Sequence, residues 1–430
     1  MSTRLSSGGR LIDRTKLVEF SFDGKRLTGF KGDTLASALL ANGQTLVGRS
    51  FKYHRPRGIV ASGPEEPNAL VGLGEGGKFE PNQRATTTEL FNGLNAKSQN
   101  AWPSLEFDIG GVNRIMSPIF PAGFYYKTFM FPRFAWKHMF EPFIRKAAGL
   151  GAAPTEKDDD KYEYFYAHVD VLIVGGGTSG LAAALEAGRV GAKVLVLEQT
   201  NTWGGRAPVD DVLINEKNSS KWIKNALSEL KKMPNVTLRA RTMGAGVYDH
   251  GWATGYECLT DHSPEKYGPR HRLWRIRAKR IITTTGAIER PLSFAGNDIP
   301  AVMLAGAVRD YIIDYGTSCG DVMVLAANND DAYRTAIAQV QAGLKVAAIL
   351  DARVSVEGAL PNQARKMGIR VETGMAISKV KGSKKVTGVS ICLQAGEGVP
   401  LEEIKCDVVA MSGGWSPIVH LWSHCPLNRK

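Results

Sequence analysis

Cysteine is scarce in this 430-residue sequence, which has five in total and none before residue 258. They are Cys258, Cys319, Cys392, Cys406 and Cys425. No two of them have the short spacing of a metal-binding or redox motif, so we expect no metal site. A cysteine-held iron–sulfur cluster is excluded from the part of the chain that precedes Cys258. Thiols without a pairing pattern indicate a reducing compartment, and we expect a cytoplasmic protein.

Long apolar runs are also absent. No stretch reaches the roughly 18 residues of a membrane span, so we expect no membrane partner. The polar start, Met1–Arg14, has no apolar core of a secretion signal. The net charge of +12 comes from dispersed Lys and Arg residues, without a dense basic block and interleaved aromatics. This distribution argues against nucleic-acid binding and favours an anionic cofactor or an acidic partner subunit.

Catalytic motifs are missing as well. None of the eight histidines lies in a recognisable acid–base or nucleophile motif. Flavin-dependent disulfide reductases carry a cysteine pair shortly after the acid that binds ribose. In this sequence the corresponding acid is Glu198, and the segment that follows it, Gly204–Pro208, has no cysteine. Disulfide chemistry is therefore excluded. We expect no catalytic residue in this chain, and a role in cofactor binding instead.

Glycine, by contrast, is abundant, with 47 residues, and its clearest cluster follows an apolar strand at Val169–Val174. Gly175, Gly177 and Gly180 form the spacing G-x-G-x-x-G before a helix rich in small residues. The first glycine makes the tight turn, the second lets a pyrophosphate approach, and the third lets the helix lie close to the strand. Free N–H groups at the helix start favour phosphate. The pattern predicts an adenine-dinucleotide site.

Glu198 ends the next predicted strand, eighteen residues after Gly180. A carboxylate at this distance accepts hydrogen bonds from ribose hydroxyls. The same charge repels a 2′-phosphate, which favours NAD or FAD over NADP. The fingerprint is more specific than its glycines alone, because it also has the preceding strand, the helix rich in small residues, the second strand and the acid at that strand's end.

The predicted fold is α/β, a Rossmann-like FAD/NAD(P)-binding fold of the disulfide-reductase type, preceded by a β-grasp, ferredoxin-like domain without a cluster. A hairpin over residues 17–30 and a helix over residues 35–43 predict the β-grasp domain, to which we assign residues 1–105. Residues 106–163 form an aromatic-rich connection and a charged linker. Its aromatics fit either local packing or a docking surface for another subunit.

Residues 164–425 are assigned to the FAD/NAD(P)-binding domain, which has a second Rossmann-like unit at about 318–400. That unit is degenerate, because Ala326, Asn328 and Asp331 replace the three glycines. Asp330 and Asp331 would repel a pyrophosphate. We therefore expect this second unit to keep the shape of a nucleotide site without its ligand.

Six segments occur in a characteristic order along the chain. They are Arg55–Gly58, Ala122–Phe129, Gly175–Gly180, Thr285–Pro291, Asn328–Tyr333 and Ser412–Pro417. Together they resemble the alpha subunit of heterotetrameric sarcosine oxidase over nearly the whole chain. The resemblance implies NAD in the fingerprint site, with Thr285 and Gly286 at the strand end that closes it. The complete predicted set is Gly175, Gly177, Thr178, Ser179, Gly180, Glu198, Gly205, Arg206, Thr285 and Gly286.

The resemblance also implies beta, gamma and delta partner subunits. In that family, sarcosine is oxidised on a flavin of the beta subunit, and a further flavin, FMN, is shared at the alpha–beta boundary. The complex converts sarcosine, oxygen and tetrahydrofolate to glycine, hydrogen peroxide and methylenetetrahydrofolate. Family members continue into a folate-binding domain that this sequence, which ends at Lys430, does not contain. We therefore expect the N-terminal portion of such a subunit, without folate handling of its own.

Two other hypotheses remain from the sequence. In the first, the chain is a self-contained FAD-dependent dehydrogenase that acts on an amino acid or on an opine-type secondary amine. In the second, it is an inactive truncated product. The first would hold FAD in the fingerprint site. The amine itself is not specified by any residue pattern in this chain.

Overall fold

The computed structural model describes residues 2–115, 123, 129, 131–147, 151–264 and 266–424. The chain forms two compact units, one of Met1–Asp158 with Glu289–Gly414 and one of Asp159–Ile288 with Trp415–Lys430. Most of the aromatic stretch Ala122–Phe129 and Cys425 lie outside the described residues. The domain limits predicted from the sequence stay a prediction, because compact units need not coincide with them.

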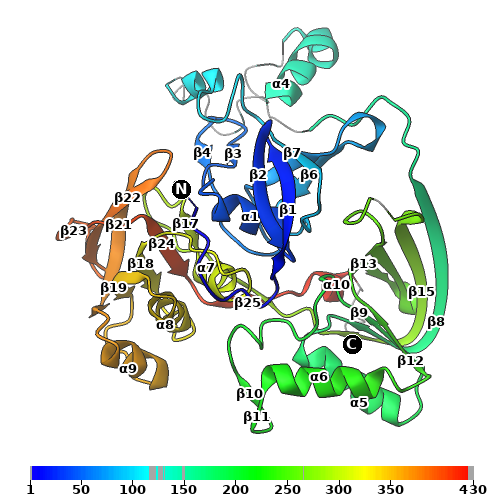
Figure 1. The fold of residues 1–430 in the computed structure, drawn as a ribbon. Coiled ribbons are helices and arrows are strands. Elements are labelled where there is room, and N and C mark those ends of the chain that lie inside the picture. The colour runs from blue at the N-terminus through cyan, green and yellow to red at the C-terminus, as the bar shows by residue number, and fades with distance from the viewer. Residues whose placement is uncertain are drawn as a thin grey trace. The chain divides into compact units, whose positions relative to one another are not determined.

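The first unit begins with a five-stranded sheet in the order β2-β1-β7-β5-β6 (Figure 1). Its strands are β1 (Asp13–Phe22), β2 (Lys25–Lys31), β5 (Leu70–Leu73), β6 (Glu80–Arg84) and β7 (Leu94–Ser98). β1 pairs antiparallel with β2 and parallel with β7. The tight turn between β1 and β2 uses Asp23 and Gly24, both with positive φ. This arrangement with one crossing helix is the predicted β-grasp fold.

The crossing helix α1 (Leu35–Ala41) is buried at every residue. It begins at Thr34, whose hydroxyl accepts the Ser37 N–H while the Ser37 hydroxyl accepts the Thr34 N–H. This reciprocal cap satisfies two amides that a helix start otherwise leaves unpaired. The shorter elements of this segment are β3 (Gly48–Arg49), β4 (Pro56–Arg57), η1 (Gly76–Lys78), η2 (Ile109–Arg114), α3 (Arg133–Ala135), η4 (Trp136–Phe140) and α4 (Glu141–Ala147).

The same unit contains a parallel sheet in the order β17-β24-β18-β19-β20. Its strands are β17 (Val302–Leu304), β18 (Val322–Ala327), β19 (Lys345–Asp351), β20 (Val371–Thr373) and β24 (Val408–Ser412), and its helices are α7 (Ala305–Ile313), α8 (Tyr333–Gln341) and α9 (Ala359–Lys366). An antiparallel sheet of β21 (Met375–Gly382), β22 (Val386–Leu393) and β23 (Glu402–Ile404) follows. One continuous apolar core joins the β-grasp residues to this parallel sheet.

The second unit is built on a six-stranded sheet in the order β12-β9-β8-β15-β14-β13. Its strands are β8 (Lys161–Val174), β9 (Val194–Leu197), β12 (Val236–Arg239), β13 (Thr242–Tyr248), β14 (Trp252–Cys258) and β15 (Pro269–Thr283). The first four in that order are parallel, as in a Rossmann fold, and β13 and β14 extend the sheet antiparallel. This confirms the predicted fold class for the fingerprint region.

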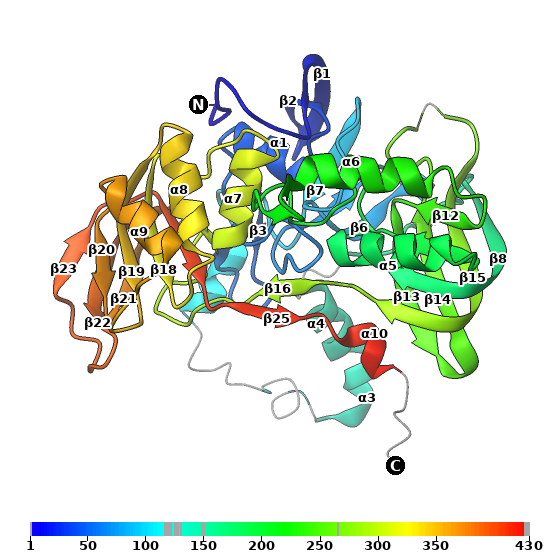
Figure 2. The ribbon, with the colours of Figure 1, turned by 90° about the horizontal axis from the view of Figure 1, so that it is seen from below.

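Two helices, α5 (Thr178–Arg189) and α6 (Ser219–Leu230), lie side by side in this unit (Figure 2). Their apolar faces pack with Ile173, Val194 and Val196 in one core. The remaining elements are β10 (Leu213–Ile214), β11 (Lys217–Asn218), η5 (Asp249–Gly251), β16 (Ala287–Glu289), β25 (Trp415–Pro417) and α10 (His420–Ser423). In the described ranges, every helix is too short or too polar to cross a membrane.

Candidate functional site

The glycine fingerprint forms a sharp turn between β8 and α5. Gly175 has a φ of 110°, and a Cβ added there would lie 2.3 Å from the Thr284 carbonyl oxygen. A Cβ added at Gly180 would lie 1.9 Å from the Gly175 carbonyl oxygen. The start of α5 can therefore pack onto the end of β8 only because position 180 has no side chain, as the spacing predicts.

Gly177 is in a different situation. An added Cβ there would meet no atom within 4 Å, so this glycine borders open space. It is the N-cap of α5, and no side chain caps this helix. The first bond within the helix is donated by the Leu181 N–H to the Gly177 carbonyl, at 2.9 Å. The amides of Thr178, Ser179 and Gly180 have no carbonyl inside the helix to bind, and they offer a phosphate site at the positive end of the helix dipole.

Glu198 lies directly beside this turn, one residue after β9. Its side chain is almost fully buried. One carboxylate oxygen accepts the Gly176 N–H at 2.7 Å, and the other accepts the Thr200 N–H at 2.8 Å and the Thr200 hydroxyl at 2.9 Å. A carboxylate has about four lone-pair sites, so this oriented group can still accept a ribose hydroxyl.

A second glycine loop runs alongside the fingerprint. The Gly204 N–H donates to the Gly176 carbonyl at 2.9 Å, and Gly204 forms a parallel bridge with Gly177. A Cβ added at Gly205 would lie 3.4 Å from the Gly177 Cα. The guanidinium of Arg206 stands 5.0 Å from the centre of the Trp415 ring. The structure thus brings Gly204 and Gly205 next to the predicted phosphate site, whereas the guanidinium of Arg206 lies over Trp415.

Thr284, which the sequence reasoning missed, closes the other side of the turn. Its N–H donates to the Val174 carbonyl at 2.8 Å, and its hydroxyl donates to the Gly175 carbonyl at 2.8 Å. Thr285, the predicted residue, instead donates its hydroxyl to the Ile418 carbonyl at 2.8 Å. Gly286 accepts the Ile418 N–H at 2.9 Å. Alternation along the strand end could have distinguished the two threonines, because neighbouring side chains point to opposite faces.

These groups are suited to holding a ligand rather than transforming one. The carboxylate, the threonine hydroxyl and the helix amides can fix a sugar and a diphosphate. None of them accepts or delivers electrons at ordinary potentials. Redox chemistry at this site therefore needs the dinucleotide itself.

In the second Rossmann-like unit, carboxylates occupy the corresponding turn. Asp331 pairs with Arg309 at 3.0 Å, and Asp330 pairs with Arg353 at 2.8 Å. The buried Asp351 accepts the Tyr333 hydroxyl at 2.9 Å and also pairs with Arg353. These ion pairs reduce the repulsion that a diphosphate would meet, but carboxylates still stand where the fingerprint has glycines. The absence of a ligand here stays a prediction.

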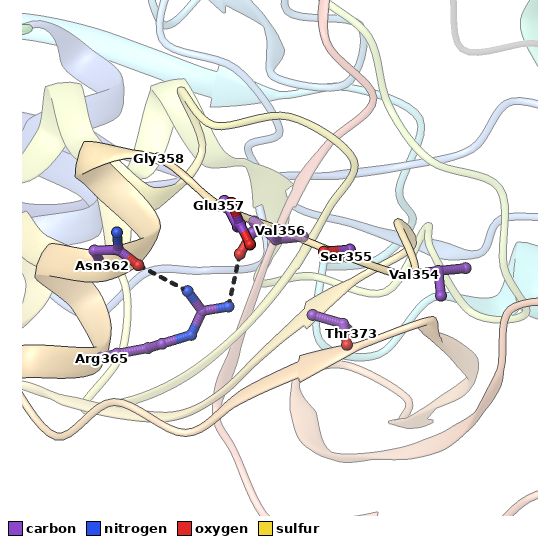
Figure 3. A pocket seen from close by; sticks show the side chains of 8 residues that line it. All are labelled: Val354, Ser355, Val356, Glu357, Gly358, Asn362, Arg365 and Thr373. Carbon is purple, nitrogen blue, oxygen red and sulfur yellow. Dashed lines mark hydrogen bonds between the residues drawn. The ribbon is translucent and has the colours of Figure 1, made fainter.

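An open depression of about 550 Å³ lies after β19, in the first unit (Figure 3). Its residues are Val354, Ser355, Val356, Glu357, Gly358, Asn362, Arg365 and Thr373. The Arg365 guanidinium donates to the Asn362 side chain at 3.1 Å and to the Val356 carbonyl at 2.9 Å. The one cation of this depression is therefore engaged by the chain itself, and we keep the fingerprint as the candidate site.

The chain is similar to known proteins both in sequence and in fold. Residues 15–101 match the family described as a 2Fe-2S iron-sulfur cluster binding domain, and residues 170–250 match the FAD dependent oxidoreductase family. Sarcosine oxidase subunit alpha of Rhizobium meliloti (strain 1021) is 46% identical over 98% of this chain and 42% of its own length. The subunit of the same name from Corynebacterium sp. (strain P-1) is 35% identical over 96% of this chain and 39% of its own length.

The crystal structure of L-proline dehydrogenase from P. horikoshii superposes with a TM-score of 0.63. It is 18% identical and covers 99% of this chain and 64% of that one, which shows a shared fold. The chain spans about two fifths of the length of the two curated relatives.

The N-terminal domain does not fit the cluster that its family description implies. Residues 15–101 contain no cysteine. In the loop before β5, the buried carboxylate of Glu66 accepts four backbone N–H groups, those of Val60, Ala61, Asn68 and Ala69, at 2.7–3.0 Å. Burial raises the pKa of this carboxyl, and the four hydrogen bonds counteract the rise. A side chain of the protein thus organises this loop, and we derive no redox step through the domain.

Proposed function

Since the chain is a homologue of sarcosine oxidase alpha subunits along 98% of its length, we propose that it is the nucleotide-binding subunit of an amine-oxidising complex. The match of residues 170–250 to an oxidoreductase family supports this class of activity. The observation that carries the proposal is the uncapped start of α5 behind Gly177, with Glu198 held beside it.

The proposed ligand is NAD. The amides of Thr178, Ser179 and Gly180 would hold its pyrophosphate, and the loop at Gly205 and Arg206 would line the same side. Glu198 would accept the adenosine ribose hydroxyls and repel a 2′-phosphate. When bound, a nicotinamide can exchange a hydride, but no hydride-acceptor site is evident beside the fingerprint in the part of the chain that the structure describes. The proposed role of NAD in this chain is therefore structural.

Sarcosine oxidation is proposed to take place on a flavin of a partner beta subunit, within a complex that also contains gamma and delta subunits. There, sarcosine would lose two electrons and two protons to give an imine, which water would hydrolyse to glycine and formaldehyde. Oxygen would finally accept the two electrons and two protons and become hydrogen peroxide. An FMN shared at the boundary with the beta subunit and a link to folate belong to the same proposal. The catalytic groups would lie on the partner, consistent with the absence of an acid–base motif in this sequence.

The experiment is to identify the ligand of the native protein. We expect acid denaturation of the chain, co-expressed with its partner subunits, to release about one NAD per chain, measured by chromatography and mass spectrometry. Glu198→Gln should reduce the preference for NAD over NADP at least about tenfold, because it removes the charge that opposes the 2′-phosphate. Glu186→Gln, on the exposed side of α5, is the matched control. Release of no adenine nucleotide would refute the proposal.

A second candidate is a self-contained FAD-dependent dehydrogenase. It is favoured by the match of the fingerprint region to the FAD dependent oxidoreductase family. In this case the chain expressed without partners would be yellow and would reduce an artificial electron acceptor with a secondary amine. A colourless protein that carries NAD would exclude this candidate.

A further inference from the structure

A cluster of three different metal-ligating groups lies at the hairpin that joins β14 to β15 in the second unit. Cys258 and His271 face each other directly in the antiparallel pairing of these strands. Asp261 follows three residues after Cys258, in the connecting loop. One ligand atom from each of the three residues lies within 4.8 Å of the other two.

The backbone holds these groups in place. The Leu259 N–H donates to the Arg270 carbonyl at 2.9 Å and continues the strand pairing past Cys258. The Ser263 N–H donates to the Thr260 carbonyl at 3.0 Å, which makes a turn around Asp261. Because residues opposite each other in antiparallel strands have Cβ atoms about 5 Å apart, the proximity of Cys258 and His271 is a property of the register.

Each nitrogen or oxygen ligand also has an orienting partner. Nδ1 of the buried His271 lies 2.6 Å from the Tyr256 hydroxyl, and the two rings are 5.0 Å apart. The carboxylate of Asp261 lies 3.2 Å from Nδ1 of His262. Metal-binding histidines and carboxylates in proteins characteristically have such outer hydrogen bonds, which fix the ring and select the binding nitrogen.

Arg270, the residue before His271 in β15, pairs with Asp160 at 2.8 Å. Among the cysteines of the described ranges, Cys258 alone is partly exposed, whereas Cys319, Cys392 and Cys406 are buried.

We propose that Cys258, Asp261 and His271 bind one divalent transition-metal ion, with Zn²⁺ the best match to a thiolate, a carboxylate and an imidazole. A tetrahedral zinc site places its ligand atoms about 3.4 Å apart. Side-chain rotations that move these atoms by roughly 1 Å would bring them from within 4.8 Å of one another to that spacing. Water would supply the fourth ligand. The ion would tie the loop at Asp261 to both strands of the hairpin. This site is independent of the proposed nucleotide function.

The test uses Co²⁺ as a coloured substitute for Zn²⁺. The full-length protein is treated with a chelator and titrated with Co²⁺ while its absorption spectrum is recorded. We expect one equivalent to give the visible bands of a tetrahedral site and a thiolate-to-cobalt band in the near ultraviolet, and Zn²⁺ to abolish both. Cys258→Ser should abolish the thiolate band, and His271→Gln and Asp261→Asn should each weaken binding at least about tenfold.

His250→Asn is the matched control, because this exposed histidine in η5, between β13 and β14, has a positive φ that asparagine tolerates. Circular dichroism shows whether each variant folds, and Asp261→Asn, which preserves the side-chain shape, serves if Cys258→Ser does not. A protein that gives no cobalt spectrum overturns the proposal. So does a thiolate band that persists in Cys258→Ser, or binding that His250→Asn weakens as much as His271→Gln does.

Discussion

At the residue scale, the fingerprint uses glycine for opposite reasons at two positions three residues apart. Gly180 is required by packing, since its Cα faces the Gly175 carbonyl of the preceding turn. Gly177 has no such neighbour, and its φ of −66° suits any residue. A missing side chain that serves no packing purpose indicates space kept for a ligand. The two substitutions to alanine therefore separate folding from binding.

Gly177→Ala is expected to fold normally, with a melting temperature close to that of the parent protein, and to lose bound adenine dinucleotide at least about tenfold, because a methyl group would occupy the approach to the helix amides. Gly180→Ala should instead destabilise the protein by about 3 kcal/mol or more, since the new methyl overlaps a backbone oxygen. Thermal unfolding and ligand content measure the two effects. Equal loss of stability in both variants would contradict this distinction.

At the element scale, local segments were predictable and their extensions were not. The sequence predicts a strand at Val169–Val174, which is the buried end of β8, and a helix at Ser179–Arg189, which is α5 within one residue. It misses the first half of β8, where Tyr162, Tyr164 and Tyr166 are exposed. These aromatics give no alternation of apolar and polar residues, because the strand there is fixed by its pairing with β15, more than a hundred residues away.

The candidate site shows the same limit. The glycines and Glu198 carry their signal in local spacing, so the sequence could predict them. Thr284 has no such signal: it reaches Gly175 only because β15 pairs with β8 in a register that ends at Thr283 and Val174. The Cys258–His271 pair is likewise created by the β14–β15 register, and its spacing along the chain matches no metal motif.

The ion pair between Asp298 and Arg57 of β4 makes a pH-dependent contribution to the stability of the folded protein. Burial opposes ionisation of Asp298, but Arg57 and Arg55 outweigh it, and the pKa of Asp298 is lowered from 3.8. A lowered pKa in the folded state gives stability that is present above pH 3.8 and is lost as the pH falls through the lowered value. Asp298→Asn should cost about 1 kcal/mol at neutral pH, because the pair is partly exposed, and should reduce this acid sensitivity.

Urea unfolding at neutral pH and below pH 3.8 measures this effect. Asp321→Asn, at the exposed start of the strand region before β18, is a control acid in the same unit. If Asp298→Asn and the parent protein differ by the same amount at both pH values, the ion pair does not contribute as described.

At the scale of the whole molecule, the first unit is assembled from two distant segments. The Tyr311 hydroxyl donates to the Ala61 carbonyl at 2.9 Å, across 250 residues of sequence. Arg4 binds Asp33 at 2.6 Å and also donates to the Tyr315 carbonyl at 2.6 Å. No local pattern predicts such pairings. The shared core explains why the β-grasp segment and the second Rossmann-like segment behave as one body in the structure.

Arg4→Ala tests this assembly. It should destabilise the protein by about 3 kcal/mol, because it leaves the fully buried Asp33 carboxylate without its cation and removes the bond to Tyr315. Thermal unfolding followed by circular dichroism measures the loss. Arg26→Ala, on the exposed β2 strand, should cost less than about 0.5 kcal/mol. Similar losses in the two variants would show that Arg4 does not join the segments.

The Glu66 carboxylate, which organises the loop before β5, has a consequence for how this domain matures in the cell. Because residues 15–101 have no cysteine to hold a cluster and Glu66 organises the loop, we expect this domain to reach its native state without iron. Growth under iron starvation should therefore leave the folding of this domain untouched.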